Sequence, residues 1–113
     1  MRLRAAIIGH SYVRRLGDHA RRHGCSTPTR FQLNRLFREI AIFGRSGYTV
    51  GELAGEVSAA GSLHPDIVII NCGTNDLCQP DCDVERVVQG LISYAHFLRV
   101  SYQVKVVIIM GAI

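Results

Sequence analysis

Short apolar runs alternate along the chain with segments whose apolar residues recur every three or four positions. We place four strands at the apolar runs, at about residues 3–9, 39–43, 66–72 and 104–110. The first, third and fourth runs are almost continuous in Ile, Val and Ala, which is typical of strands buried on both faces of a parallel sheet. The pattern therefore predicts a parallel sheet with helices on both sides.

Helical spacing fills the segments between these runs and predicts three helices. The first covers residues 12–23, the second covers 49–60, and the third begins after Asp83 as its N-cap. Thr49 and Glu52 have the spacing of a capping box at the start of the second helix. The residues expected to face the core are Val13, Leu16 and Ala20 in the first helix; Val50, Leu53, Ala54 and Val57 in the second; and Val84, Val87, Val88, Leu91, Ile92, Ala95 and Leu98 in the third.

Alternating strands and helices indicate βαβ units and a three-layer α/β sandwich. A chain of 113 residues has room for one core, so we expect residues 1–113 to form a single domain. The last strand, 104–110, is the most apolar, and an exposed edge of that kind favours aggregation. We therefore expect that the domain is an incomplete piece of a longer fold, or that a partner or self-association covers this edge.

Charge is distributed unevenly along the chain. Residues 1–45 hold ten arginines against two acidic residues, whereas residues 46–113 hold three basic residues against seven acidic ones. Arginine grips phosphate and carboxylate groups well, so a nucleic-acid partner is one interpretation of the first half and solvated helix faces are the other. There is no secretion signal or membrane span, and the four cysteines are too few for a disulfide scaffold, so we expect a cytoplasmic protein.

The sequence predicts neither a metal nor a cofactor. Cys72, Cys78 and Cys82 do not have the spacing of a common zinc finger, and no fourth ligand lies near them. A glycine-rich phosphate loop does not follow the first strand. A nucleotide- or flavin-binding domain is a further alternative, and the missing phosphate loop argues against it.

Candidate chemistry gathers where three of the predicted strands end. Gly9-His10-Ser11 follows the first strand, Gly44-Arg45-Ser46-Gly47 follows the second, and Asn71-Cys72-Gly73-Thr74-Asn75-Asp76 follows the third. In open α/β sheets, ligands bind at the carboxyl ends of the strands. Taken singly, each segment is also explained as a helix cap or a turn, because serine, glycine, asparagine and aspartate are common in such places.

Together the three segments resemble the signature blocks of the SGNH (GDSL-type) hydrolase superfamily. The segment from Pro65 to Asp76 is similar to the third block with its preceding strand, and it is the most specific match. The resemblance implies a flavodoxin-like three-layer sandwich in which Ser11 is the nucleophile. The backbone N–H groups of Ser11 and Gly47 and the side-chain amide of Asn75 would then form an oxyanion hole.

Two departures from the family pattern affect the expected activity. His10 stands where the family usually has aspartate, a change we expect to be tolerated. The family's Asp-x-x-His block, which supplies the general base, does not occur in these 113 residues. Loss of such a base removes almost all activity in serine hydrolases, and none of the five histidines is a good substitute, including His10, because neighbouring residues rarely point the same way.

We therefore expect a truncated SGNH-type esterase or acyl hydrolase domain that lacks its last βα unit, acts on a small ester or acylated substrate and has little activity alone. The alternative is a non-catalytic module that keeps the cleft and binds a carbohydrate, an acyl group or nucleic acid. The Gly-His-Ser block followed by Tyr-Val-Arg-Arg-Leu is also similar to esterase-like domains of some retrotransposons.

Overall fold

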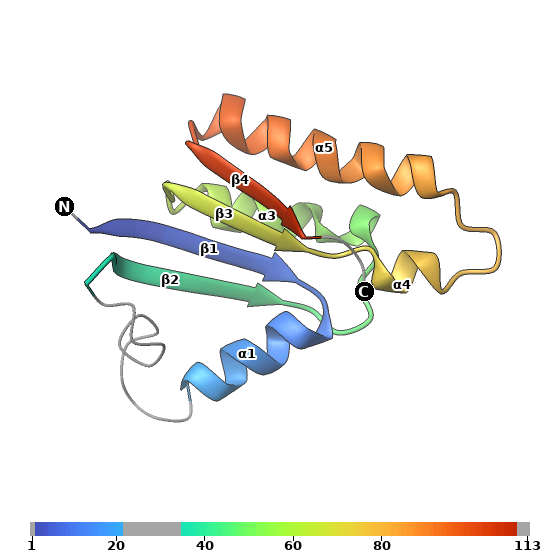
Figure 1. Ribbon diagram of the computed structural model, residues 1–113, viewed down its shortest axis with the longest axis horizontal. Coiled ribbons are helices and arrows are strands. Elements are labelled where there is room, and N and C mark those ends of the chain that lie inside the picture. The colour runs from blue at the N-terminus through green and yellow to red at the C-terminus, as the bar shows by residue number, and fades with distance from the viewer. Residues whose placement is uncertain (1, 22–34, 111–113) are drawn as a thin grey trace.

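The computed structural model describes residues 2–21 and 35–110, which form one parallel sheet with helices on both faces (Figure 1). The strands are β1 (Leu3–Gly9), β2 (Phe37–Gly44), β3 (Ile67–Asn71) and β4 (Val106–Met110). The helical elements are α1 (Ser11–Arg21), the 3₁₀ turn η1 (Val50–Leu53), α3 (Ala54–Gly61), the short α4 (Thr74–Leu77) and α5 (Val84–Ser101). Among these residues, no helix combines the length and apolar character that crossing a bilayer requires.

All four strands run parallel in the order β2-β1-β3-β4. The chain therefore passes from β1 outward to β2 and then returns to the other side of β1, which is the switch in strand order that defines a doubly wound sheet. These strands are the first four of the flavodoxin-like order. The predicted fold class, a flavodoxin-like α/β sandwich with a parallel sheet, is confirmed.

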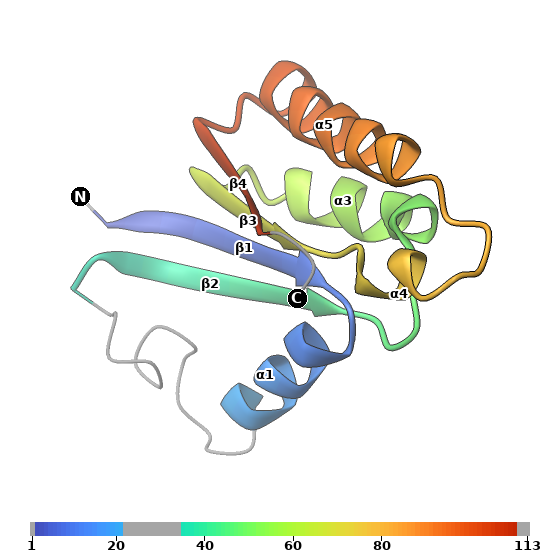
Figure 2. The same ribbon diagram turned by 45° about the vertical axis from the view of Figure 1, so that its right-hand side comes forward.

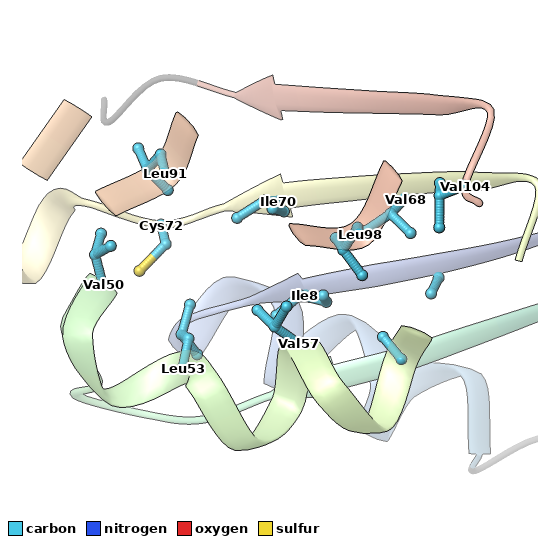
Figure 3. Packing of buried hydrophobic residues seen from close by; sticks show 12 residues of the cluster. Ile8, Val50, Leu53, Val57, Val68, Ile70, Cys72, Leu91, Leu98 and Val104 are labelled. Atoms are coloured by element: carbon cyan, nitrogen blue, oxygen red, sulfur yellow. The ribbon is translucent and has the colours of Figure 1, made fainter. Parts of the chain in front are cut away.

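The main core lies between the sheet and the layer formed by η1, α3 and α5 (Figures 2 and 3). Alternate residues of β1 and β3 point into it. There they meet Leu53 of η1, Val57 of α3, and Leu91 and Leu98 of α5. Helix α1 covers the opposite face over β1 and β2. Both faces of β1 are therefore covered, which accounts for its continuous apolar sequence. Strand β3 is buried on the side of α3 and α5 through Val68 and Ile70, while Ile67 and Ile69 on its other face are half-buried.

The first strand matches its predicted bounds, and the other three differ from prediction by two residues or fewer at each end. The fourth strand begins two residues later than predicted, at Val106, because Gln103 has a positive φ of 58° and turns the chain after α5. Val104 is nevertheless buried, in the turn that precedes the strand. The loop predicted at residues 23–34 lies outside the described residues.

Two predicted helices differ from the structure in form and in burial. The segment expected as one helix over 49–60 is a 3₁₀ turn followed by α3, and Ala54 in it is exposed. The capping carboxylate is confirmed, since Glu52 accepts a hydrogen bond from the Thr49 backbone N–H at 3.0 Å. The Glu52 carboxylate also accepts a hydrogen bond from the Thr49 hydroxyl at 2.9 Å, and the two bonds lower the pKa of Glu52.

The apolar stripes predicted on the first and third helices are only partly buried. In α1, Val13 is buried and Leu16 is exposed. In α5, Leu91 and Leu98 are buried and Val87 packs against the core, whereas the other large members of the predicted stripe, Val84, Val88 and Ile92, are exposed. The prediction was wrong for these three because the apolar residues of α5 extend beyond the face that meets the sheet.

Candidate active site

The carboxyl ends of the strands bring the three sequence segments to one edge of the sheet. Gly9 lies in register between Gly44 of β2 and Asn71 of β3, and Asn71 is in turn level with Met110 of β4. The polar segments that follow Gly9, Gly44 and Asn71 therefore start side by side, although up to about 60 residues separate them in sequence.

Helix α1 starts directly at the end of β1 and lies against β2. The backbone N–H of Arg14 donates to the carbonyl of His10 at 3.1 Å, which closes the first turn of the helix. A Cβ atom on Gly44 would collide with the backbone of Arg14, so only glycine lets the helix approach β2 this closely. Ser11 is the first residue of α1 and its position follows from this contact, while its side chain lies outside the described part of the structure.

The segment after β2 turns at Gly47 and is held on both sides. The Arg45 N–H donates to the carbonyl of Gly9 at 3.0 Å, and the Arg14 guanidinium donates to Ser46 Oγ at 3.1 Å. The Arg45 guanidinium pairs with Glu56 of α3 at 2.7 Å, which raises the pKa of Arg45. Gly47 has φ = 78°, a conformation that other residues rarely adopt, and it is exposed.

The segment after β3 forms α4, a helix that the sequence analysis missed because it is only four residues long. Gly73 begins it with φ = 118°. Two side chains of α4 then reach the segment that follows Gly47. Asn75 Nδ2 donates to the carbonyl of Tyr48 at 3.0 Å, and the Asp76 carboxylate accepts from the backbone N–H of Val50 at 3.0 Å.

The hydrogen bond from Asn75 to Tyr48 fixes the orientation of the amide. An amide NH₂ group carries two N–H donors, and the carbonyl of Tyr48 takes one of them. The second donor is held in a defined direction by the same contact. A fixed donor of this kind can stabilise negative charge that develops on a reacting oxygen without the cost of reorienting it.

The three predicted site residues thus come from adjacent segments at the same edge of the sheet. Asn75 and the turn at Gly47 are directly linked through Tyr48, and the Arg45 N–H links that turn to the end of β1, two residues before Ser11. The catalytic roles assigned to Ser11, Gly47 and Asn75 remain predictions.

The histidines whose placement the structure describes lie at four separate places. His10 is buried beside Ser11, with 3% of its surface exposed. His19 is exposed on α1, His64 precedes β3 at the amino edge of the sheet and stacks edge-on against Tyr102, and His96 is exposed on α5. His23 lies outside the described residues. His64 is thus at the opposite edge of the sheet from Ser11.

Two features near Asn75 were missed from sequence alone. One is the hydrogen bond that the Asp76 carboxylate accepts from the Val50 N–H. Asp76 belongs to the third signature segment, but the sequence analysis gave it no role. The other is a cleft of about 680 Å³ between η1 and the start of α5, lined by Thr49, Asp76, Gln79, Arg86 and Tyr94, among others. Tyr94 anchors this region by donating from its hydroxyl to the carbonyl of Val50 at 2.6 Å. No sequence signal marks the cleft, because its wall comes from distant segments.

Cys72 lies close to these contacts, and burial raises the pKa of its thiol to about 11. A thiol with that pKa stays protonated near neutral pH and is a poor nucleophile. In the described ranges 2–21 and 35–110, no three side chains of His, Cys, Asp or Glu come together as a metal site would need.

Comparison with solved structures shows the same fold in several ester hydrolases. An acetyl xylan esterase, AlAXEase, has a TM-score of 0.70 and 17% identity, and the match covers 94% of this chain and 57% of that chain. A catalytic mutant of an acetylxylan esterase from Geobacillus stearothermophilus gives 0.64 and 20%, over 97% of this chain and 59% of the other. LAE5, an α/β hydrolase from the metagenome of Lake Arreo, gives 0.61 and 24%, over 95% and 59%.

The chain thus spans less than three-fifths of each of these three structures. No curated protein sequence matches it. The sequence itself matches the GDSL-like Lipase/Acylhydrolase family over residues 7–112, nearly its whole length. The chain, with its three signature segments at one edge of a flavodoxin-like sheet, is therefore a member of the GDSL-like lipase/acylhydrolase family.

Proposed function

We propose that this chain is the part of a serine ester hydrolase that carries the nucleophile and the oxyanion hole. In this proposal the Ser11 hydroxyl attacks the carbonyl carbon of an acyl ester. The N–H groups of Ser11 and Gly47 and the Asn75 amide receive the oxygen as it becomes negative. The C–O bond to the alcohol then breaks, the alcohol takes up the proton that serine lost, and the acyl group stays on Ser11 as an ester.

The observation that carries the proposal is the hydrogen bond from Asn75 to the Tyr48 carbonyl. It holds a donor amide beside the turn at Gly47, at the edge of the sheet where α1 begins with Ser11. Sequence similarity supports the reaction class, since the family is one of lipases and acylhydrolases. The solved acetyl xylan esterases suggest small acyl groups on sugars as a substrate class.

We propose further that the general base is a histidine from outside these 113 residues, so that the chain alone acylates slowly. The same missing base also slows removal of the acyl group by water, because that step needs the same proton transfer. With p-nitrophenyl acetate the phenolate leaves without needing a proton, whereas attack by water on the acyl-serine still needs the base. We therefore expect the second step to be the slower one and the acyl-serine to accumulate.

Mass spectrometry after incubation with p-nitrophenyl acetate tests both parts of the proposal. We expect one acetyl group on Ser11, absent from Ser11→Ala and unchanged in Ser58→Ala, an exposed serine of α3. Asn75→Ala should slow acylation by about 10²-fold. Asp76→Ala, which loosens the same loop but keeps the amide, should slow it far less.

Each other outcome of this experiment contradicts a defined part of the proposal. Many Ser11-dependent turnovers per chain would show that a base is already present among these residues. Acetylation no faster at Ser11 than at Ser58 would remove the hydrolase interpretation and favour a non-catalytic binding module. Equal loss in Asn75→Ala and Asp76→Ala would assign the effect to loop position rather than to the amide.

We also propose a cytoplasmic location, supported by the free thiols of Cys72, Cys78 and Cys82 in the described part of the chain. Reduced cysteines are the usual state in that compartment. Fractionation of cells that express the tagged chain tests this directly, and recovery from the secreted fraction would contradict it.

A further inference from the structure

The uneven charge of the sequence becomes an uneven distribution of charge in the molecule. Among the described residues, 2–21 and 35–45 hold eight arginines against Asp18 and Glu39, whereas 46–110 hold three basic residues against seven acidic ones. The first group builds β1, α1 and β2, and the second builds β3, β4 and the helices on the other face of the sheet (Figure 2). The end of the sheet that carries β2 and α1 is therefore basic.

Strand β2 is an outer strand at the opposite end of the sheet from β4. In the flavodoxin-like order further strands add beyond β4, so β2 stays on the outside when the sheet is extended. Arg35, in the turn before β2, and Arg38, near its start, are exposed. No hydrogen bond or ion pair engages either side chain within residues 2–21 and 35–110. Their charges are thus available to a partner from solvent.

Two further arginines lie at the carboxyl end of β2. Arg14 of α1 donates from Nη1 to the Ser46 hydroxyl at 3.1 Å, a neutral acceptor that leaves the charge of the guanidinium in place. Arg45 pairs with Glu56 at 2.7 Å and keeps less of its charge. Both arginines line a hollow of about 220 Å³ beside the last residues of β2. An anion in this hollow would be attracted mainly by Arg14.

Together Arg14, Arg35, Arg38 and Arg45 form an arginine row along the outer strand. Arg38 and Arg45 are seven residues apart, which is roughly 23 Å of extended chain at about 3.3 Å per residue. One strand of DNA carries a phosphate about every 3.4 Å of its axis, so the row is as long as about six phosphates of one strand. A linear polyanion can therefore contact both ends of the row at once.

The residue type favours phosphate over simple protection of a sheet edge. Charge that only keeps outer strands from pairing is most often lysine, whereas every basic residue in 2–21 and 35–45 is arginine. The planar guanidinium fork matches two oxygens of a phosphate group. A membrane surface would instead favour a helix with an apolar face turned outward, and α1 buries Val13 against the sheet.

We propose that the arginine row binds the phosphate backbone of a nucleic acid. Contacts to phosphate do not read base sequence directly, so this binding is independent of sequence. The proposal does not depend on the hydrolase function, because none of the four arginines has a role in the proposed hydrolysis.

Fluorescence anisotropy of a labelled oligothymidine strand of about 20 nucleotides, titrated with the purified chain, tests the proposal. We expect a Kd of about 10⁻⁶–10⁻⁴ M near physiological salt, which is the usual range for binding without sequence preference. Repeating the titration from about 50 to 200 mM NaCl gives the number of phosphate contacts. Three contacts predict a slope of about −2 for the logarithm of the association constant against the logarithm of the salt concentration, at about 0.7 per contact.

A pair of double variants with the same net charge separates the row from general attraction. Arg35→Gln with Arg38→Gln should raise Kd at least about tenfold and make the slope shallower by about 1.4, because two phosphate contacts are lost. Arg86→Gln with Arg99→Gln removes the same charge from exposed positions on α5. That control should change Kd by less than about twofold.

Three results would overturn the proposal. One is a wild-type chain that does not bind the strand at about 50 mM NaCl, or whose affinity does not depend on salt. Another is equal weakening in the two double variants, which would assign the attraction to net charge alone. The third is sedimentation with vesicles containing about 30% phosphatidylserine that is as tight as binding to the strand and is lost in the Arg35 and Arg38 double variant, which would assign the row to a membrane surface.

Discussion

Glycine serves two different physical needs at the ends of the strands. At Gly44 the need is space, because α1 lies directly against the strand and a Cβ atom would overlap the backbone of Arg14. At Gly47 there is open space around the position, and the need is the backbone conformation at φ = 78°. Sequence alone gives both residues the same interpretation, a flexible turn, and only the packing of α1 separates them.

Replacing Gly44 by alanine should destabilise the fold because α1 must move away from β2. We expect Gly44→Ala to lower the free energy of unfolding by about 3 kcal/mol, the upper range of overpacking effects. Gly55→Ala is the matched control, since that glycine is exposed in α3 and nothing lies near its added methyl group.

The control should raise the free energy of unfolding by about 0.5–1 kcal/mol through helix propensity. Urea denaturation followed by circular dichroism measures both variants. Equal, small effects at the two positions would mean that α1 does not press on β2 as described.

At the same scale, the candidate site shows what a motif can and cannot reveal. Asn75 was assigned to the oxyanion hole from the resemblance of its segment to a signature block. Its bond to the Tyr48 carbonyl was not predictable, because Tyr48 precedes Asn75 by 27 residues and the contact depends on how the two segments leave the sheet. The motif identified the residue, and the packing of α4 determines its direction.

Among the secondary-structure elements, apolar spacing predicted the helices well and their burial less well. Helix α5 begins after Asp83, whose side chain accepts from the Arg86 N–H as an N-cap should. The seven residues of its predicted apolar stripe were all assigned to the core, because spacing alone records that a residue is apolar and not which neighbour it meets. In the structure one part of the stripe, with Leu91 and Leu98, meets the sheet, and the other part, with Val84, Val88 and Ile92, is exposed.

The contact between α4 and η1 depends strongly on one carboxylate. Asp76 accepts the backbone N–H of Val50, which begins η1 and would otherwise lack a partner within that turn. We expect Asp76→Ala to lower the free energy of unfolding by about 1–2 kcal/mol, as for the loss of a helix cap or a charged hydrogen bond.

Asp81→Ala is the control for this prediction, since Asp81 is exposed in the same region. It should change the free energy of unfolding by less than about 0.5 kcal/mol. Thermal denaturation of the two variants beside the wild type decides the matter. Equal melting temperatures for Asp76→Ala and the wild type would show that the hydrogen bond from Val50 to Asp76 adds nothing to stability.

Across the whole molecule, the sequence indicated a parallel α/β sheet, but not the order of its strands. The continuous apolar residues of β1 and β3 predicted burial on both faces, and the structure buries β3 fully on one face only. Their place at the centre follows from the pairing of β1 with both β2 and β3, which no local pattern encodes. The flavodoxin-like order came from the resemblance to a family, and the pairing confirms it.

The two faces of the sheet carry unequal shares of the core, and this predicts unequal local stability. On the face covered by η1, α3 and α5, the main cluster includes Val57, Leu91 and Leu98. On the other face, α1 contributes Val13 as its buried apolar side chain among the described residues, and Leu16 is exposed. Apolar burial is the main source of stability, so α1 should open at a lower free energy than α5.

Native-state hydrogen exchange measures this difference directly. Amides in the middle of α1 should exchange at least about tenfold faster than those in the middle of α5, and those of β1 and β3 should be slowest, because strands pair with them on both sides. If α1 exchanges as slowly as β1, the helix belongs to the same cooperative unit as the core, and the uneven burial has no energetic consequence.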